Sequence, residues 1–264
     1  MITKSHRKIL KITKDNVKFK VVSKNFQDEL FWKNYQTNKW EKDFFKTFSK
    51  IKNINNYTFV DVGASNGCLS LYAAHFCKKV LSLEPDIRIF NQLKINLKLN
   101  KKNITPLNLA LNIKNGKINS NQSDNFSSTM FSTLKKIIIM QAITFDELYK
   151  KYIKNNKFFL KIDIEGYEFT LLNDNNFYEL LKINKPPVYL AIHIGAGPLF
   201  KYKNAPFKFL QRFYNLSKTF CEYKLLYKLL LNYKKIEIDG VLSTRLFFFN
   251  PSYYRKGVNI FMSN

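Results

Sequence analysis

Hydrophobic and polar positions at the start of the chain follow first a period of two and then a helical period. Residues 8–25, KILKITKDNVKFKVVSKN, alternate on both sides of Asp15-Asn16, which predicts two strands joined by a tight turn. Residues 28–50 then carry apolar side chains at helical spacing, which predicts amphipathic helices. These side chains are Leu30, Phe31, Tyr35, Trp40, Phe44, Phe45 and Phe48. We expect residues 1–50 to form an N-terminal extension packed on a core domain of residues 51–264.

From residue 57 onward, short apolar runs alternate with amphipathic stretches. The runs that predict strands are YTFVDV, KVLSLE, ITPLNLAL, IIIMQAI, KFFLKIDI and PVYLAIHI. Helices are expected over residues 68–77 and 87–100, from residue 145, and near residues 167–181. The polar stretch 112–128 predicts a loop or an irregular hairpin. This alternation of strands and helices predicts an α/β fold with a parallel sheet.

The end of the chain departs from the alternation. A helix is expected over residues 206–218, followed by CEYKLLYKLLL and TRLFFFN, two strands joined without a helix past Asp239-Gly240. Such a hairpin adds antiparallel strands to an otherwise parallel sheet. We therefore predict a mostly parallel, twisted sheet with helices on both faces and a C-terminal antiparallel hairpin.

Composition bounds the class of protein. The chain has 264 residues, 45% of them hydrophobic and 16% aromatic, which suits one globular domain with a full core. Its three cysteines form no CxxC pair, which excludes a disulfide scaffold and favours a reducing cytoplasm. The first residues lack the apolar region of a secretory signal, and the longest apolar stretches fall short of the ~20 residues that span a bilayer. We expect a cytoplasmic protein without membrane insertion.

The charge balance raises the question of a nucleic-acid partner. Lys and Arg number 44 against 19 Asp and Glu, a formal net charge of +25. Clustered basic side chains bind phosphate, but here lysine is scattered evenly among Asn, Ile, Phe and Tyr, a bias typical of AT-rich coding sequence. We expect no specific nucleic-acid partner. A nucleic-acid-binding module or an RNA methyltransferase that uses the basic surface remains the alternative.

Two motifs at successive strand ends indicate a nucleotide-type site. FVDVGASNG is an apolar strand that ends in Asp61, followed by a turn with Gly63 and Gly67 that opens a helix. Its spacing is GxxxG and not the GxGxxG of a pyrophosphate-binding loop, which disfavours NAD. The next strand ends in Glu84, about 20 residues beyond the first glycine, where a carboxylate can accept both ribose hydroxyls of an adenosine cofactor. Plain turn chemistry for the glycines and a helix-start role for Glu84 remain open.

Acidic groups and a histidine follow two later strands. In KIDIEGYE, Asp163 ends a strand and Glu165 lies just beyond it, so both reach the ligand crevice of an open parallel sheet. Either carboxylate could orient a hydroxyl, act as a base or hold an ammonium group, although Glu165 could also be a helix-start acid. His193 ends the strand VYLAIHI and is a candidate base or substrate contact, or else a core histidine.

These motifs together resemble the FkbM-type family of S-adenosylmethionine-dependent methyltransferases. The matching stretches are FVDVGASNGCLSLYAA, VLSLEPD, NLALN, ITFDEL and FLKIDIEGYEFTLL, which cover about half the chain in the family's order. The resemblance implies a Rossmann-like class I methyltransferase fold and a cofactor site. The residues that it places at the cofactor are Glu41, which with Trp40 resembles the family's acidic approach helix, and Asp61, Gly63, Asn66, Gly67, Glu84, Asn108, Ala110 and Asp163.

The resemblance also implies the activity. We expect transfer of a methyl group from S-adenosylmethionine to an oxygen, or less readily a nitrogen, of a sugar, glycan or small-molecule acceptor. Asp163, Glu165 and His193 are the expected catalytic residues. Many relatives carry an acid beside the histidine, whereas this chain has Ala191 there, so we assign no metal ligands.

Overall fold

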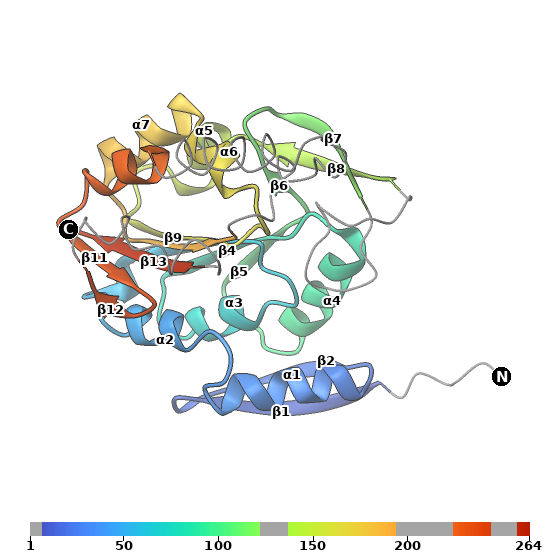
Figure 1. The fold of residues 1–264 in the computed structure, drawn as a ribbon. Helices are drawn as coiled ribbons and strands as arrows, with labels where there is room; N and C mark the ends of the chain where they lie inside the picture. The colour runs from blue at the N-terminus through green and yellow to red at the C-terminus, as the bar shows by residue number, and fades with distance from the viewer. Residues whose placement is uncertain (1–6, 122–136, 194–223, 244–257) are drawn as a thin grey trace, which may run out of the picture.

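An eight-stranded sheet runs through the centre of the molecule (Figure 1), with the strand order β12-β11-β13-β10-β9-β3-β4-β5. It is seen in a computed structural model that describes residues 7–121, 137–193, 224–243 and 258–264. The parallel strands are β3 (Thr58–Val62), β4 (Lys79–Leu83), β5 (Ile104–Leu107), β9 (Phe158–Ile162) and β10 (Val188–Ile192). The sequence predicted each of these as a strand.

Three antiparallel strands extend the sheet beyond β10. They are β13 (Val258–Ser263), β11 (Lys235–Ile238) and β12 (Val241–Leu242), of which β13 lies between β10 and β11. A short turn at Asp239 and Gly240, both with positive φ, joins β11 to β12. The predicted antiparallel end of a mostly parallel α/β sheet is therefore present.

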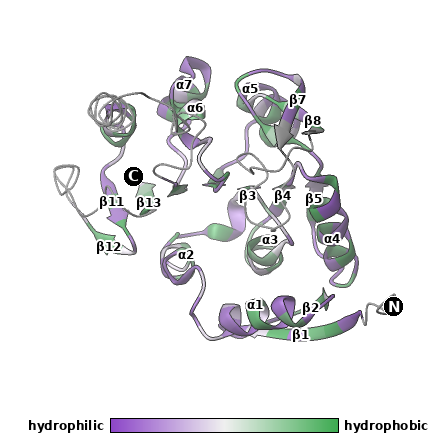
Figure 2. Cartoon of the chain, turned by 45° about the vertical axis from the view of Figure 1, so that its right-hand side comes forward, coloured by the Kyte–Doolittle hydropathy of each residue, from purple (hydrophilic) through white to green (hydrophobic). Residues whose placement is uncertain are grey.

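Helices cover both faces of the sheet. Along β3, the side chain of Phe59 joins one buried cluster and its neighbour Val60 the other, because successive strand residues point to opposite faces. The helices α2 (Lys42–Phe48), α3 (Cys68–Ala73) and α4 (Ile87–Lys98) lie below the sheet in Figure 1. Above it lie α5 (Phe145–Leu148), the π-helix η2 (Tyr149–Ile153), α6 (Glu168–Leu172) and α7 (Asn175–Asn184). Figure 2 shows hydrophilic and hydrophobic residues alternating along α4 and α7, as amphipathic helices require, whereas every residue of α3 is buried.

The N-terminal residues form a separate layer under α3 and α4. A two-stranded hairpin, β1 (Lys8–Lys14) and β2 (Val17–Ser23), turns at Asp15 and Asn16, whose φ values are 45° and 68°. Positive φ at both central residues is the two-residue turn that matches strand twist, so the predicted hairpin is confirmed. Helix α1 (Phe26–Gln36) follows, and a 3-10 turn, η1 (Ile54–Asn56), leads into β3.

The region after β5 differs from the prediction of one strand in ITPLNLAL. The chain leaves the main sheet and forms a second, three-stranded sheet of β6 (Ala110–Leu111), β8 (Ile137–Ile143) and β7 (Gly116–Asn121). The side-chain amide of Asn108 donates to the carbonyl oxygens of Glu84 (2.8 Å) and Pro85 (3.0 Å), which ties the break between the two strands to the end of β4. Within the polar stretch 112–128, residues 116–121 form β7, which pairs antiparallel with β8.

One predicted strand is wrong. Residues 224–230, within CEYKLLYKLLL, form a helix. Leu226, Leu229, Leu230 and Tyr233 are buried, and their spacing of three and four residues is the helical period. Leucine and lysine also favour helix over strand, whereas the run lacks β-branched residues. The predicted helix 206–218 and the strand TRLFFFN lie outside the described residues.

Candidate functional site

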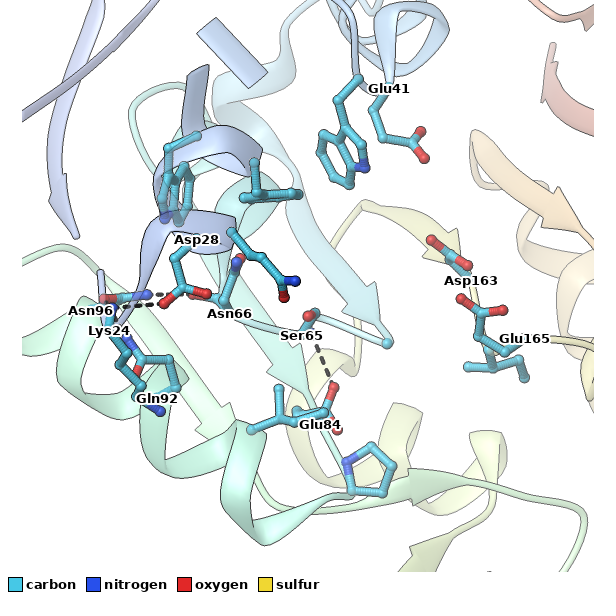
Figure 3. A pocket seen from close by; sticks show the side chains of 18 of the residues that line it. Lys24, Asp28, Glu41, Ser65, Asn66, Glu84, Gln92, Asn96, Asp163 and Glu165 are labelled. Carbon is cyan, nitrogen blue, oxygen red and sulfur yellow. Dashed lines mark hydrogen bonds between the residues drawn. The ribbon is translucent and has the colours of Figure 1, made fainter. Parts of the chain in front are cut away.

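A cavity of about 450 Å³ opens at the carboxyl ends of β3, β4, β9 and β10 (Figure 3). Ligand pockets in open parallel sheets form at this edge. The lining comes from the loops after these strands, from helix α4 and from the N-terminal residues. From the predicted set, the lining includes Glu41, Gly63, Asn66, Glu84, Asp163, Glu165 and His193.

The turn after β3 requires glycine at its first position. Gly63 has φ +78°, and a Cβ atom there would lie 1.9 Å from the carbonyl oxygen of Asp163. A side chain at residue 63 would therefore force the β3 and β9 ends apart. Gly67, with φ +87°, begins α3 and is outside the cavity lining, whereas the intervening Ser65 and Asn66 line it.

Glu84 is a buried carboxylate in the middle of the cavity wall. Its side chain accepts from the backbone N–H groups of Ser65 (3.0 Å) and Asp86 (2.9 Å), and the residue is 5% exposed. Burial raises the pKa of Glu84 to about 7, although the two backbone hydrogen bonds oppose that shift. Each carboxylate oxygen accepts more than one hydrogen bond, so Glu84 can still bind two ligand hydroxyls.

Asn108 and Ala110, which the resemblance places at the cofactor, lie outside the lining. Asn108 stabilises the chain at the end of β4 through its bonds to two carbonyl oxygens. Ala110 is buried in β6 and 8% exposed. The hydrogen bonds of Asn108 place it beside the β4 end that carries Glu84, and Ala110 follows two residues later in the chain. The predicted contact of both residues with the cofactor stays a prediction.

Asp61, expected at the cofactor, lies beneath the cavity in a buried polar chain. Its Oδ2 accepts from the hydroxyl of Ser70 (2.6 Å), which in turn accepts from the hydroxyl of Ser82 (2.6 Å). Its Oδ1 lies 3.3 Å from the ammonium of Lys161. In this structure, Asp61 is a neighbour of the cavity residues through Lys161 and is not itself part of the lining.

Sequence reasoning missed Lys161, which connects the ends of β3 and β9. Its ammonium donates to the carbonyl oxygen of Gly63 (3.1 Å) and lies 3.5 Å from Oδ2 of Asp163. Burial alone would lower the pKa of Lys161, but the carboxylates of Asp163, Asp61 and Glu41 outweigh it and raise that pKa. The available signal was a single lysine inside the apolar strand KFFLKIDI, opposite Asp61 of the neighbouring strand.

Glu41 reaches the cavity from the N-terminal residues. It has φ 50°, precedes α2, and its Oε2 accepts from the phenol of Tyr189 (3.1 Å). Burial, together with the charge of Asp163, raises the pKa of Glu41. Trp40 lines the cavity beside it.

Three candidate catalytic residues meet at one end of the cavity. Nε2 of His193 lies 3.7 Å from Oδ1 of Asp163 and 3.7 Å from Oε2 of Glu165. Burial would lower the pKa of His193, but the hydrogen bond to Glu168 and the surrounding carboxylates raise it to about 9. Burial raises the pKa of Glu165 to about 7, against the charge of His193. One ligand-capable atom of each of the three lies within 4.8 Å of the others, which is a spacing that could hold a metal ion.

The opposite end of the cavity was not predicted. Figure 3 shows Lys24, Asp28, Gln92 and Asn96 grouped on the far side of Ser65 from Asp163 and Glu165. Gln92 and Asn96 are buried on α4, four residues apart, and hold the backbone of Val22 by hydrogen bonds of 3.0 and 2.8 Å. Two amides at helical spacing on an otherwise apolar face were the signal in the sequence.

Comparison with known proteins decides the family. The family model for the methyltransferase FkbM domain matches residues 61–200, just over half of the chain and the part that carries Glu84, Asp163 and His193. The chain belongs to the FkbM methyltransferase family. No curated protein matches the chain.

Several solved structures are only distantly similar to this FkbM protein. Aeropyrum pernix fibrillarin with bound S-adenosyl-L-methionine is 11% identical, with a TM-score of 0.43 over 85% of this chain and 74% of fibrillarin. A putative O-methyltransferase from Klebsiella pneumoniae is 9% identical, with a TM-score of 0.42 over 85% and 80%. The Methanococcus jannaschii fibrillarin pre-rRNA processing protein is 12% identical, with a TM-score of 0.41 over 97% of each chain. The family match, and not these similarities, identifies the chain.

As an FkbM methyltransferase with a Rossmann-like sheet, the protein uses S-adenosylmethionine as its cofactor. The cavity fits such a molecule. Its volume lies within the usual range for ligand pockets of roughly 300–1,000 Å³, and the buried carboxylate of Glu84 has the acceptor chemistry that ribose hydroxyls require. Among the residues described, no helix has the length and apolar character needed to cross a bilayer.

Proposed function

We propose that the protein transfers the methyl group to a hydroxyl of a sugar, glycan or small-molecule acceptor. The main support for this proposal is that one cavity contains two groups. Glu84 can accept ribose hydroxyls, and the group Asp163, Glu165 and His193 can bind a hydroxyl of the acceptor. Both lie at the carboxyl edge of the sheet, so one molecule of cofactor can reach from the first to the second. We propose further that residues 1–50 form an extension that packs on the domain of residues 51–264 and forms part of the cavity wall.

The cofactor supplies an electrophilic methyl group next to the acceptor. In our proposal Glu84 accepts the ribose hydroxyls, the Gly63–Asn66 turn leaves room for the cofactor against the backbone, and Asp163 flanks its methionine part. Asp163 and Glu41, both at the cavity wall, offer negative charge to the cationic groups of the cofactor. Asn66, Gly67, Asn108 and Ala110 stay candidate cofactor contacts, and Asp61 acts on the site through Lys161.

The acceptor oxygen must lose its proton as it gains the methyl group. His193, with a pKa near 9, carries its own proton at neutral pH and is therefore a poor base in the free protein. The carboxylate of Glu165 is the better proton acceptor, because a base is most effective when its pKa is near the working pH. His193 then orients the two carboxylates, and Asp163 positions the hydroxyl.

The charge of the cavity argues for a neutral or cationic acceptor. Apart from Lys24 and His193, its ionisable lining residues are acidic: Asp28, Glu41, Glu84, Asp163 and Glu165. A phosphate-rich acceptor such as RNA would meet this negative wall although the whole chain is strongly basic. We propose a cytoplasmic small-molecule or glycan acceptor on this basis.

The test is a screen of acceptors with S-adenosylmethionine that carries a radiolabelled methyl group. Glycans, free sugars and small hydroxylated metabolites of the source cell are offered in parallel with its total RNA. Label in a sugar or small-molecule fraction, lost with Glu84→Ala, supports the proposal. Label in RNA alone, or an N-methyl product, would contradict it.

A further inference from the structure

At one end of the cavity, three side chains that can ligate a metal ion lie near one another without hydrogen bonds between them. Nε2 of His193 faces two carboxylate oxygens, from Asp163 and Glu165, at 3.7 Å each. That distance is too long for a hydrogen bond. Ligands about 2.1 Å from a cation are about 3.0 Å apart when adjacent and about 4.2 Å apart when opposite. Both separations lie within that range, so a cation could be accepted with little rearrangement.

The second nitrogen of His193 is already held in place. Nδ1 lies 3.2 Å from Oε1 of Glu168, a side chain that is completely buried. Glu168 is fixed in turn by the backbone N–H groups of Ile164 (3.0 Å) and Gly166 (2.9 Å). A histidine that ligates a metal usually donates its other N–H to a carboxylate in this way. A cation bound here would displace the proton from Nε2, whose lone pair would then face the ion.

The charges nearby leave the two carboxylates short of compensation. Lys161 is shared between Asp61, the carbonyl of Gly63 and Oδ2 of Asp163, so Oδ1 of Asp163 faces His193 instead. Among the described residues, no N–H or O–H group donates a hydrogen bond to the carboxylate of Glu165, which is about one third exposed to the cavity, at 36%. Free carboxylate oxygens beside an oriented imidazole suit a divalent cation such as Mn²⁺.

We propose that Asp163, Glu165 and His193 bind a divalent cation at the acceptor end of the cavity. The inference rests on the proposed function for its role in catalysis, but not for binding itself. Position 191, next to the histidine strand end, is an alanine, and both acids of the group come from the end of β9 and the loop after it. The site thus combines two oxygen donors and one nitrogen donor from the ends of β9 and β10.

The cation would help the acceptor to ionise. A hydroxyl bound to a divalent ion is a stronger acid, so its proton passes more readily to the carboxylate oxygen of Glu165 that does not contact the ion. The acceptor oxygen then forms its bond to the methyl carbon while the bond from that carbon to sulfur breaks, and the proton leaves through Glu165 to water. No oxidant or further reactant is required.

The experiment measures Mn²⁺ binding to the whole chain by electron paramagnetic resonance, after treatment with a chelator. The variants are Glu165→Gln, which removes the negative charge at almost constant size, and His193→Asn, which removes the imidazole nitrogens. Asp146→Asn is the matched control, because Asp146 is an exposed acid that pairs with Lys150 and does not line the cavity. Melting temperature and S-adenosylhomocysteine binding show whether each variant is folded.

We expect stoichiometric binding to the unmodified chain and to Asp146→Asn, and a loss of affinity of about tenfold or more in both site variants. Absence of binding at millimolar Mn²⁺, or equal binding in all four proteins, would overturn the proposal. Methyl transfer is measured separately with and without chelator. Transfer that is unchanged by the chelator would leave the proposed function intact and remove the cation from it. Mn²⁺ binding without any methyl transfer would support the cation site and contradict the proposed function.

Discussion

Single side chains in this cavity keep charges in places where burial makes charge costly. Glu84 is 5% exposed and Lys161 is 3% exposed, yet each is held by specific partners. Glu84 accepts two backbone N–H groups, and Lys161 lies between two aspartates. Strongly perturbed buried charges are concentrated at functional sites, so variants of these two residues test the proposed site most directly.

The pKa of Glu84 predicts a pH dependence of stability. The side chain titrates near 4.5 in the unfolded chain and near 7 in the folded one, so between these values only the unfolded chain has lost its proton. Raising the pH through this window therefore lowers the free energy of unfolding, by about 3 kcal/mol at most. Chemical denaturation at pH 5 and pH 8 measures the change.

Comparison with Glu84→Gln isolates this residue from all other titrating groups. The variant loses one backbone hydrogen bond at both pH values, so its absolute stability is not the readout. We expect its stability to fall less from pH 5 to pH 8 than that of the unmodified protein. An identical fall in both would show that Glu84 titrates normally.

For Lys161, we predict a stability effect that comes from a buried charge pair and not from titration. Lys161→Met removes the positive charge from Asp61, which is completely buried. We expect a loss of about 3–5 kcal/mol in the free energy of unfolding, because an unpaired buried carboxylate remains. The double variant Lys161→Met/Asp61→Asn should recover part of that loss. Equal stability of the single and double variants would contradict a charge-pairing role.

The sequence allowed most site residues at strand ends to be predicted, but not the residues beneath them. Glu84, Asp163 and His193 could be predicted because the carboxyl ends of parallel strands meet at one edge. Lys161 could not, because its role depends on the register that places it opposite Asp61. Glu165 was predicted as an acid near the crevice, but its distance to His193 depends on the loop between β9 and α6.

At the scale of elements, the hairpin β1–β2 forms part of the cavity through its attachment to α4. Asn96 is completely buried, and accepts from the N–H of Val22 (2.8 Å) while donating to the carbonyl of Asn66 (2.9 Å). One side chain thereby connects the hairpin, α4 and the turn after β3. The N-terminal layer is therefore fixed to the same loop that lines the cavity.

Asn96→Ala should loosen the hairpin. We expect a loss of about 1–3 kcal/mol in stability and faster hydrogen exchange at the amide of Val22, because two buried polar groups lose their partner. Asn100→Ala is the matched control: Asn100 lies just past the end of α4 and bonds both backbone groups of Lys20, but through exposed hydrogen bonds. If the control exchanges as fast as Asn96→Ala, burial is not what fixes the hairpin.

Element prediction succeeded where period and turn chemistry agreed. Asp15-Asn16 marked the hairpin turn, and the alternating runs marked the five parallel strands. It failed at CEYKLLYKLLL, where leucines at helical spacing were taken for a continuous apolar strand. The departure of β6 and β8 from the main sheet depends on long-range contacts such as those of Asn108, which no local pattern contains.

For the whole molecule, the net charge of +25 and the acidic cavity point to different partners. Dispersed lysines attract polyanions through counterion release, which weakens steeply with salt. The cavity, with five acidic lining residues, repels them. In our proposal, the acidic cavity and not the basic outer surface therefore selects the acceptor.

Binding of mixed-sequence RNA and DNA should consequently be weak and nonspecific. We expect the affinity to fall by orders of magnitude between about 50 and 200 mM salt, without preference for sequence. Fluorescence anisotropy with several labelled oligonucleotides at both salt concentrations measures this. A tight, sequence-dependent complex at the higher concentration would favour the RNA methyltransferase alternative.

The proposed function requires that the cofactor occupies the cavity with its ribose hydroxyls bound to Glu84. Calorimetry with S-adenosylhomocysteine tests this without knowledge of the acceptor, on the unmodified chain, on Glu84→Ala and on Glu179→Ala, whose acid is exposed and paired with Lys182. We predict one binding site, weakened by about 2–4 kcal/mol in Glu84→Ala and unchanged in Glu179→Ala, with all three proteins folded. Unchanged affinity in a folded Glu84→Ala protein, or no binding to the unmodified chain, would contradict the account.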